Sequence, residues 1–297
     1  MSGNHLFNTL SDKTIYVFFD ESGKGNDRPN LMGSLSIPKD IYKQEIFSYY
    51  NYFLRKKEIN LHWKKYRGED IQRMNMVKAI ELLFTFLPFI KLNVINYNSY
   101  YLKGRPNFTQ KDIDNTIYTK FPERLIYGQI RGYGHEVTVN VEIFIDKANE
   151  YSGRKKKSKK LVIEDLGLNE QVNEILNQEA IKNSLPVKMI NTLNSQSMYR
   201  GENFYTNSCK MYPKNVEIGL ELIDLFLGFV RIIIQNPNPT SKGEQAKVEF
   251  IFDQLQNEDF CNFLENLTYF EWKGTQQLNK FDFKDYINAF KIKRMYG

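Results

Sequence analysis

The stretch Thr14–Gly23 constrains the fold more than any other, because an apolar run there ends on acidic residues. The six residues from Thr14 to Phe19 are mostly β-branched or aromatic, and the polar, glycine-containing residues 22–27 that follow are typical of a turn. The sequence therefore predicts a buried strand with Asp20 at its end.

A carboxylate at the end of a buried strand needs compensation for its lost hydration. Hydrogen bonds, a cation or a metal ion can supply it. Successive strand residues face opposite sides, so Asp20 and Glu21 cannot both point into one site while the strand stays regular, and Asp20 is favoured. The alternative is that Asp20 caps the following turn through backbone amides.

Composition sets the broad class of protein. The 297 residues are 41% hydrophobic and 14% aromatic, which is enough for the full core of a soluble globular protein. The net charge of +6 is compatible with a polyanionic partner. Cys209 and Cys261 have neither metal-ligand nor disulfide spacing, and residues 1–13 lack the apolar segment of a signal peptide. We therefore expect a cytoplasmic protein without a membrane partner.

Residues 216–234 form the second informative segment and predict a buried helix, since several charges interrupt what would otherwise be an apolar span. Like charges one turn apart repel, and a bridging cation would relieve this repulsion. The alternative is a narrow polar stripe in water, with Glu221 or Asp224 paired to Lys or Arg. Gly228 lies on the same face one turn after Asp224, and its lack of a side chain leaves room for another group to approach the helix. The positions on this face are Glu217, Glu221, Asp224, Gly228 and Arg231.

Residues 137–146 show clean alternation of apolar and polar side chains, which predicts a second core strand ending on Asp146. A break or kink is expected at Pro122, and residues 194–215 are expected to be irregular. The other predicted strands are 31–37, 89–95 and 186–191, and the other predicted helices are 38–57, 69–86, 112–131 and 169–182.

Three separated carboxylates therefore stand out, on Asp20, Asp146 and Asp224. If the two strands lie side by side and the late helix packs over their ends, these side chains converge on one point. Such a cluster suits Mg²⁺ or Mn²⁺, and two ions about 4 Å apart can activate a water and stabilise the leaving oxygen in phosphodiester cleavage.

The run Arg154–Lys160 carries six positive charges in seven residues. It is expected to be a solvated loop, and the alternative is an arm that contacts phosphates. Its candidate nucleic-acid-binding residues are Lys155, Lys156, Lys157, Lys159 and Lys160.

Four segments carry a resemblance to a known family. They are Phe19–Gly23 after its strand, Leu61–Trp63, Ile145–Lys147 at a strand end, and Ile218–Gly228 on the late helix. Together and in this order, the chain resembles the domain-of-unknown-function family 3800, a ribonuclease-H-like group, over residues 14–234.

The resemblance implies an α/β, ribonuclease-H-like fold with a mixed central sheet flanked by helices. Residues 1–234 would form this domain with inserted loops and helices, and residues 235–297 a helical C-terminal extension packed on it. Asp20, Asp146 and Asp224 would be the metal ligands and catalytic residues.

Two positions depart from the family pattern. Asn60-Leu61 stands where the family has an acidic residue before its His, and Ile223 stands where it has Ala before its Asp. The first departure leaves the fourth carboxylate of a ribonuclease-H-type site unassigned. The remaining candidates are Glu21 and Glu221 as that carboxylate, and His62 and Ser22 as supporting groups.

The predicted function is a divalent-metal-dependent nuclease acting on RNA or DNA. One alternative is a catalytically silent subunit that binds nucleic acid or assembles with a protein partner in a bacterial antiviral defence or mobile-element system. Another is a metal-dependent hydrolase of a small phosphorylated molecule, which would turn over nucleotides without affinity for oligonucleotides.

Overall fold

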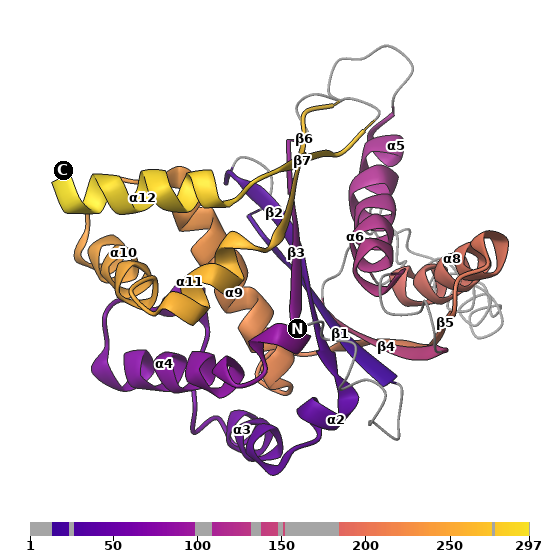
Figure 1. The fold of residues 1–297 in the computed structure, drawn as a ribbon, viewed down its shortest axis with the longest axis horizontal. Coiled ribbons are helices and arrows are strands. Elements are labelled where there is room, and N and C mark those ends of the chain that lie inside the picture. The colour runs from indigo at the N-terminus through magenta and orange to yellow at the C-terminus, as the bar shows by residue number, and fades with distance from the viewer. Residues whose placement is uncertain are drawn as a thin grey trace, which may run out of the picture.

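A central sheet stands between two layers of helices in the computed structural model of the protein (Figure 1). This arrangement confirms the predicted α/β class, with a mixed sheet flanked by helices. The structure describes residues 14–23, 27–98, 109–131, 138–147, 151, 184–274 and 277–296.

The sheet has seven strands in the order β5-β4-β1-β2-β3-β6-β7. Strand β1 pairs antiparallel with β2, and β2 antiparallel with β3, whereas β4 runs parallel to β1 and β5 parallel to β4. The strands are β1 Thr14–Ser22, β2 Asn30–Pro38, β3 Lys91–Tyr97, β4 Val139–Asp146, β5 Phe204–Tyr212, β6 Thr268–Trp272 and β7 Asn279–Phe281.

Strand β1 lies inside the sheet and is covered on both faces. Tyr16 and Phe18 belong to the hydrophobic core on one face, and Ile15, Val17 and Phe19 to the core on the other. Burial on both faces explains why this strand reads as a continuous apolar run rather than an alternating one.

The larger helical layer covers one face of the sheet, and α9 runs through its centre across β1, β2 and β4. This helix was predicted from its apolar composition, and the prediction is confirmed. The helices of this layer are α2 Lys39–Tyr42, α3 Glu45–Arg55, α4 Asp70–Phe84, α9 Ile218–Gln235, α10 Lys242–Gln254, α11 Glu258–Glu265 and α12 Lys284–Tyr296, with short 3-10 turns at Trp63–Lys65 and Leu87–Phe89.

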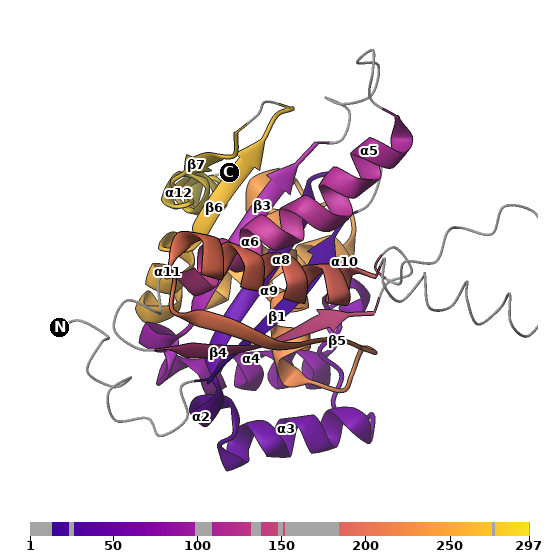
Figure 2. The same ribbon diagram turned by 90° about the vertical axis from the view of Figure 1, so that its right-hand side faces the viewer.

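A smaller layer covers the opposite face, where α6 and α8 lie in front of the sheet in Figure 2. It contains α5 Gln110–Asn115, a π-helical segment Thr116–Lys120, α6 Phe121–Ile130 and α8 Leu185–Arg200. The helix predicted over 112–131, with a break or kink at Pro122, is interrupted by this π-helical segment just before the proline. The proline occupies the first turn of α6, where its missing N–H costs little, and the π-helical segment carries the chain into it.

Three other predicted elements are corrected. The predicted strand 186–191 is part of α8, because Leu185, Met189 and Leu193 are buried at helical spacing and the short apolar run was ambiguous. Residues 194–215, expected to be irregular, complete α8 and form β5. The helix predicted over 38–57 is divided into α2 and α3.

The C-terminal region is not only helical, so the expected helical extension over 235–297 is wrong in that respect. Strand β6 pairs parallel with β3 and continues the central sheet, and β7 pairs with β6. The aromatic and β-branched residues of Thr268–Trp272 favour a strand. This region therefore shares the sheet with the N-terminal strands.

Both cysteines, Cys209 and Cys261, are buried and unpaired, as their spacing predicted. Among the described residues, we find no helix with the length and apolar character needed to cross a membrane. The predicted helix 169–182 lies outside the described residues.

Candidate active site

Asp20 and Asp146 lie on neighbouring parallel strands. The register pairs Phe19 with Ile145, so the two aspartates follow at the same level of the sheet, on the face that α9 covers. Strand β1 continues through Ser22, two residues beyond Asp20. The Asp20 carboxylate is buried and accepts a hydrogen bond from the Glu21 backbone amide at 2.7 Å.

Asp224 and Glu221 come from α9, which approaches the sheet closely at Gly33. This glycine lies opposite Asp20 on β2, and a Cβ there would stand 2.7 Å from Leu227 Cδ2. Absence of a side chain at Gly33 therefore allows α9 to bring its carboxylates next to those of β1 and β4.

Lys214, from the loop between β5 and α9, joins the three aspartates. Its Nζ lies 3.5 Å from Asp146 Oδ2, 3.6 Å from Asp224 Oδ1 and 3.8 Å from Asp20 Oδ2. The predicted convergence of Asp20, Asp146 and Asp224 is thus present in the structure, around an ammonium group. We call these three residues with Lys214 and Glu221 the carboxylate cluster.

His62 holds the other carboxylate oxygen of Asp224. Its Nδ1 lies 3.2 Å from Asp224 Oδ2. The next residue, Trp63, packs onto α9 at Gly228, where an added Cβ would stand 1.9 Å from Trp63 Cδ1. The space predicted at Gly228 is therefore filled by an indole ring, which fixes the His62 loop on the helix.

Burial and the charge of Asp224 raise the pKa of Asp20 well above its usual value, and burial also raises the pKa of Asp146 despite the nearby Lys214. Burial pushes the pKa of Asp224 upward too, but its hydrogen bond with His62 and the charge of Lys214 outweigh this, so its pKa is lowered. The single ammonium therefore does not offset the cost of ionising Asp20 and Asp146 in this buried site.

Lys214 itself responds to the same charges. Burial disfavours its ammonium form, but Asp20, Asp224 and Asp146 outweigh burial and raise the pKa of Lys214 above its usual value. The lysine is charged in this site at neutral pH. The sequence predicts only an irregular segment around Lys214, and the signal that could have found this lysine is the surplus of carboxylates predicted around one point.

Glu221 is the better-placed candidate for a fourth carboxylate. Its Oε1 accepts a hydrogen bond from the Asn215 amide at 2.7 Å, and burial raises its pKa. Glu217, on the same predicted face, instead lies at the start of α9. There it binds Arg55, with the carboxylate oxygen 2.5 Å from the guanidinium, and accepts a hydrogen bond from Tyr42. It is therefore separate from the cluster.

Glu21 and Ser22 are not brought into the cluster. Glu21 neighbours the Tyr151 hydroxyl, and burial together with the Glu21 charge raises the pKa of that tyrosine well above its usual value. Since Phe19 packs on Tyr151 as well, Glu21 points to the face opposite Asp20. Ser22 is partly buried at the last position of β1. The predicted nucleic-acid-binding residues Lys155, Lys156, Lys157, Lys159 and Lys160 lie outside the described residues.

As the side chains stand, no set of three or more His, Cys, Asp or Glu residues in the described part of the chain is arranged around a common metal position. The ammonium of Lys214 takes up the space among the aspartates. Two carboxylate oxygens nearby, Asp146 Oδ1 and Glu221 Oε2, are buried and make no hydrogen bond to any described residue.

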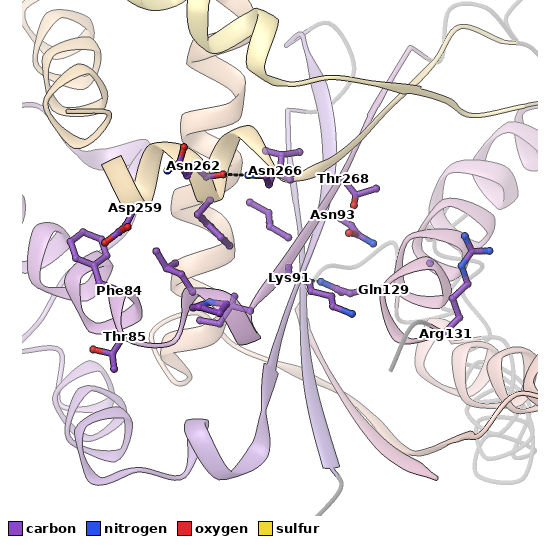
Figure 3. Close-up of a pocket in the computed structure, with 17 residues that line it drawn as sticks. Phe84, Thr85, Lys91, Asn93, Gln129, Arg131, Asp259, Asn262, Asn266 and Thr268 are labelled. Carbon is purple, nitrogen blue, oxygen red and sulfur yellow. Dashed lines mark hydrogen bonds between the residues drawn. The ribbon is translucent and has the colours of Figure 1, made fainter. Parts of the chain in front are cut away.

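A separate cavity of about 740 Å³ opens where β3 begins, at the end of the sheet away from the cluster (Figure 3). Side chains from both helical layers surround it, including Phe84, Asn262 and Gln129. None of the cluster carboxylates lines this cavity.

Comparison of the chain with protein-family profiles, curated proteins and solved structures finds no match.

Proposed function

We propose that the chain is a divalent-metal-dependent nuclease with a ribonuclease-H-like fold, which hydrolyses phosphodiester bonds in nucleic acid. The observation that carries the proposal is the position of the Lys214 ammonium, within 3.8 Å of an oxygen of each of Asp20, Asp146 and Asp224. Three carboxylates around one monovalent cation form a site where a divalent cation would gain more electrostatic energy.

The residues present fit such an ion. Mg²⁺ and Mn²⁺ prefer carboxylate and water oxygens, and Asp146 Oδ1 and Glu221 Oε2 are buried oxygens without a hydrogen-bond partner among the described residues. Asp20, Asp146 and Asp224 would hold the metal, with Glu221 as the fourth carboxylate. The Lys214 side chain, which is 41% exposed, would turn outward to make room.

When bound, divalent cations activate a water for attack on phosphorus and stabilise the leaving oxygen. The chain's own residues would have supporting tasks. His62 would keep Asp224 oriented and ionised. Lys214, turned outward from the metal position but still beside it, would neutralise charge on the phosphate.

The strand arrangement supports the same proposal. Asp20 and Asp146 lie on the two adjacent parallel strands of a mixed sheet, and a helix carries the third aspartate over their ends. This is the kind of sheet implied by the resemblance at Phe19–Gly23, Ile145–Lys147 and Ile218–Gly228.

A second candidate is a catalytically silent subunit that binds nucleic acid. The observation that favours it is the same lysine, because Lys214 already compensates part of the carboxylate charge without any metal. In that case Lys214 would be a permanent part of the site, and divalent ions would neither bind nor matter.

Cleavage of a labelled panel tests the proposal. Single-stranded, duplex and hybrid RNA and DNA, with free nucleotides as a further arm, are incubated with Mg²⁺ or Mn²⁺ and either the wild type or Asp146→Asn. We expect metal-dependent cleavage of a polymer by the wild type only. Turnover of free nucleotides alone, equal cleavage by both proteins, or no cleavage would contradict the nuclease proposal.

A further inference from the structure

Four cationic side chains lie near one another, since the charges of three of them act on the fourth, Lys247. Two come from the 3-10 turn after His62 and the residues that follow it, one from α9 and one from α10, and we call them the basic surface: Lys64, Arg67, Arg231 and Lys247. The Lys64 carbonyl oxygen accepts hydrogen bonds from both Arg67 Nη1 at 2.9 Å and Lys247 Nζ at 3.3 Å. One backbone oxygen therefore holds two cations near each other.

These side chains are positioned by packing. The Arg67 stem crosses the first turn of α10 at Gly243, where an added Cβ would stand 2.5 Å from Arg67 Cδ. Lys247 Nζ lies 5.6 Å from the centre of the Trp63 ring, which is itself packed against α9. Lys247 therefore lies over the same indole that fixes the His62 loop.

The basic surface also lies in line with the carboxylate cluster. Asp224 and Arg231 are seven residues apart on one face of α9, which corresponds to about 10 Å along the helix axis. The charges of a duplex strand recur at about 3.4 Å of rise along the duplex axis, so a strand running along α9 presents further phosphates within this length. A strand with one phosphate at the cluster would therefore bring another phosphate near Arg231.

Positive charge predominates around Lys247. Burial and the charge of Arg67 lower the pKa of Lys247, the charges of Arg231 and Lys64 act in the same direction, and that of Glu244 acts in the opposite direction. The Glu244 carboxylate accepts hydrogen bonds from Thr240, so it already has partners of its own.

Two further carboxylates near the basic surface are also engaged. Asp27 forms an ion pair with Arg231, and Glu69 accepts a hydrogen bond from the Arg67 backbone amide at 2.8 Å. Lys64 and Arg67 are exposed, and Lys247 is partly exposed, so an external anion can reach them.

We infer that Lys64, Arg67 and Lys247 bind the phosphate backbone of a nucleic-acid strand that passes through the carboxylate cluster. This inference rests on the proposed function, because it assigns a second contact to the same substrate. Phosphate contacts of this kind position a strand without reading its sequence. The contact therefore sets which phosphate reaches the cluster rather than which base is cut.

Equilibrium binding of labelled single-stranded and duplex oligonucleotides, in EDTA and over a series of salt concentrations, tests the inference. The variants are Lys64→Gln, Lys247→Gln and their combination, and the matched control is Lys280→Gln, an exposed lysine on β7. Melting temperatures of the wild type and of all four variants establish that they are folded. Polyglutamate is the competitor that represents an acidic protein.

We expect each single variant to bind more weakly whatever the sequence, and to lower the slope of log K against log salt by about 0.7–0.9, which is the loss of one phosphate contact. The combined variant should lose roughly twice that slope, and the control none. Equal binding by the combined variant and the control, absence of salt-dependent binding by the wild type, or competition by polyglutamate as strong as by nucleic acid would overturn the inference.

This experiment separates the two proposals, because it needs neither metal nor cleavage. If the wild type never cleaves but the variants lose binding, the phosphate-binding role of the basic surface is supported and the nuclease proposal is contradicted. If the wild type cleaves with metal but the variants bind as it does, the nuclease proposal is supported and the role of the basic surface is contradicted.

Discussion

The Nδ1 atom of His62 lies 3.2 Å from Asp224 Oδ2, while Asp224 Oδ1 lies 3.6 Å from Lys214 Nζ. Each carboxylate oxygen of Asp224 therefore has a different partner. His62 fixes one oxygen from the loop before α4, which leaves the other directed at the centre of the carboxylate cluster. His62 therefore orients the Asp224 carboxylate.

Replacing His62 by Ala should weaken both stability and metal binding. The hydrogen bond to the ionised carboxylate is lost, which lowers the free energy of unfolding by about 1.5–3 kcal/mol. Loss of a partner that orients a metal-binding carboxylate typically costs about 10–100-fold in metal affinity or activity. Denaturant unfolding and Mn²⁺ titration measure the two effects. His62→Gln, which can still donate a hydrogen bond, should recover part of each, and an equal loss in both variants would contradict a positioning role.

Replacing Lys214 by Met should destabilise the protein in EDTA but strengthen Mn²⁺ binding. Removal of the ammonium leaves Asp20, Asp146 and Asp224 facing one another without a cation, which costs about 1–3 kcal/mol. Added Mn²⁺ should then raise the melting temperature more in this variant than in the wild type. Lys210→Met, on the exposed side of β5, is the matched control. A smaller metal-induced shift in Lys214→Met than in the control would indicate that the lysine supports metal binding.

The stability of the metal-free protein should fall as pH rises. The pKa values of Asp20 and Asp146 are raised above 3.8 in the folded state, so the folded state binds more protons than the unfolded state once pH exceeds that value. The free energy of unfolding therefore decreases with rising pH from about pH 4 toward neutrality. The lowered pKa of Asp224 has the opposite effect, because it makes the free energy of unfolding increase with pH. This effect is confined to pH values below its unfolded pKa of 3.8.

Denaturant unfolding in EDTA between about pH 4 and pH 7 checks this dependence. Asp20→Asn should show a shallower decrease, because one of the three carboxyl groups with raised pKa values, Asp20, Asp146 and Glu221, is gone. A wild-type stability that rises over this interval, or an Asp20→Asn slope as steep as that of the wild type, would contradict the account of the cluster charge.

Replacing Gly228 by Ala should disrupt the contact between α9 and the His62 loop. The new methyl group would stand 1.9 Å from Trp63 Cδ1, and overpacking of this kind costs about 1–3 kcal/mol. Gly128 on α6 is the control, because the nearest atom to its added Cβ is 3.9 Å away. Gly128→Ala should stabilise by about 0.5–1 kcal/mol through helix propensity. Thermal unfolding of both variants measures the difference, and equal effects would contradict the close approach of Trp63.

Much of the site could be predicted from local patterns. Strand β1 and helix α9 were evident from their apolar runs and strand β4 from its alternation, and the acidic residues were conspicuous within these segments. The pairing of β1 with β4 could not be derived, because strand order depends on contacts far apart in the sequence. Lys214 was missed for the same reason: its significance comes only from the three aspartates that the fold brings to it.

The errors have physical causes as well. Residues Pro186–Asn191 have too few apolar positions to distinguish a strand from a helix. The structure forms a helix here, in which Leu193, one turn after Met189, is also buried. Strand β6 is short, and the helices on either side of it dominated the pattern of the C-terminal region.

Titration of Mn²⁺ into the metal-free protein, followed by the signal of free Mn²⁺, tests the central claim that the space around Lys214 Nζ is a divalent-cation site. The proteins to compare are the wild type, Asp146→Asn, Lys214→Met and, as a control, Asp285→Asn on the exposed face of α12. We predict saturable binding by the wild type and the control, tighter binding by Lys214→Met and loss of binding by Asp146→Asn. Affinities that are equal in all four proteins, or no saturable binding in any of them, would contradict the claim.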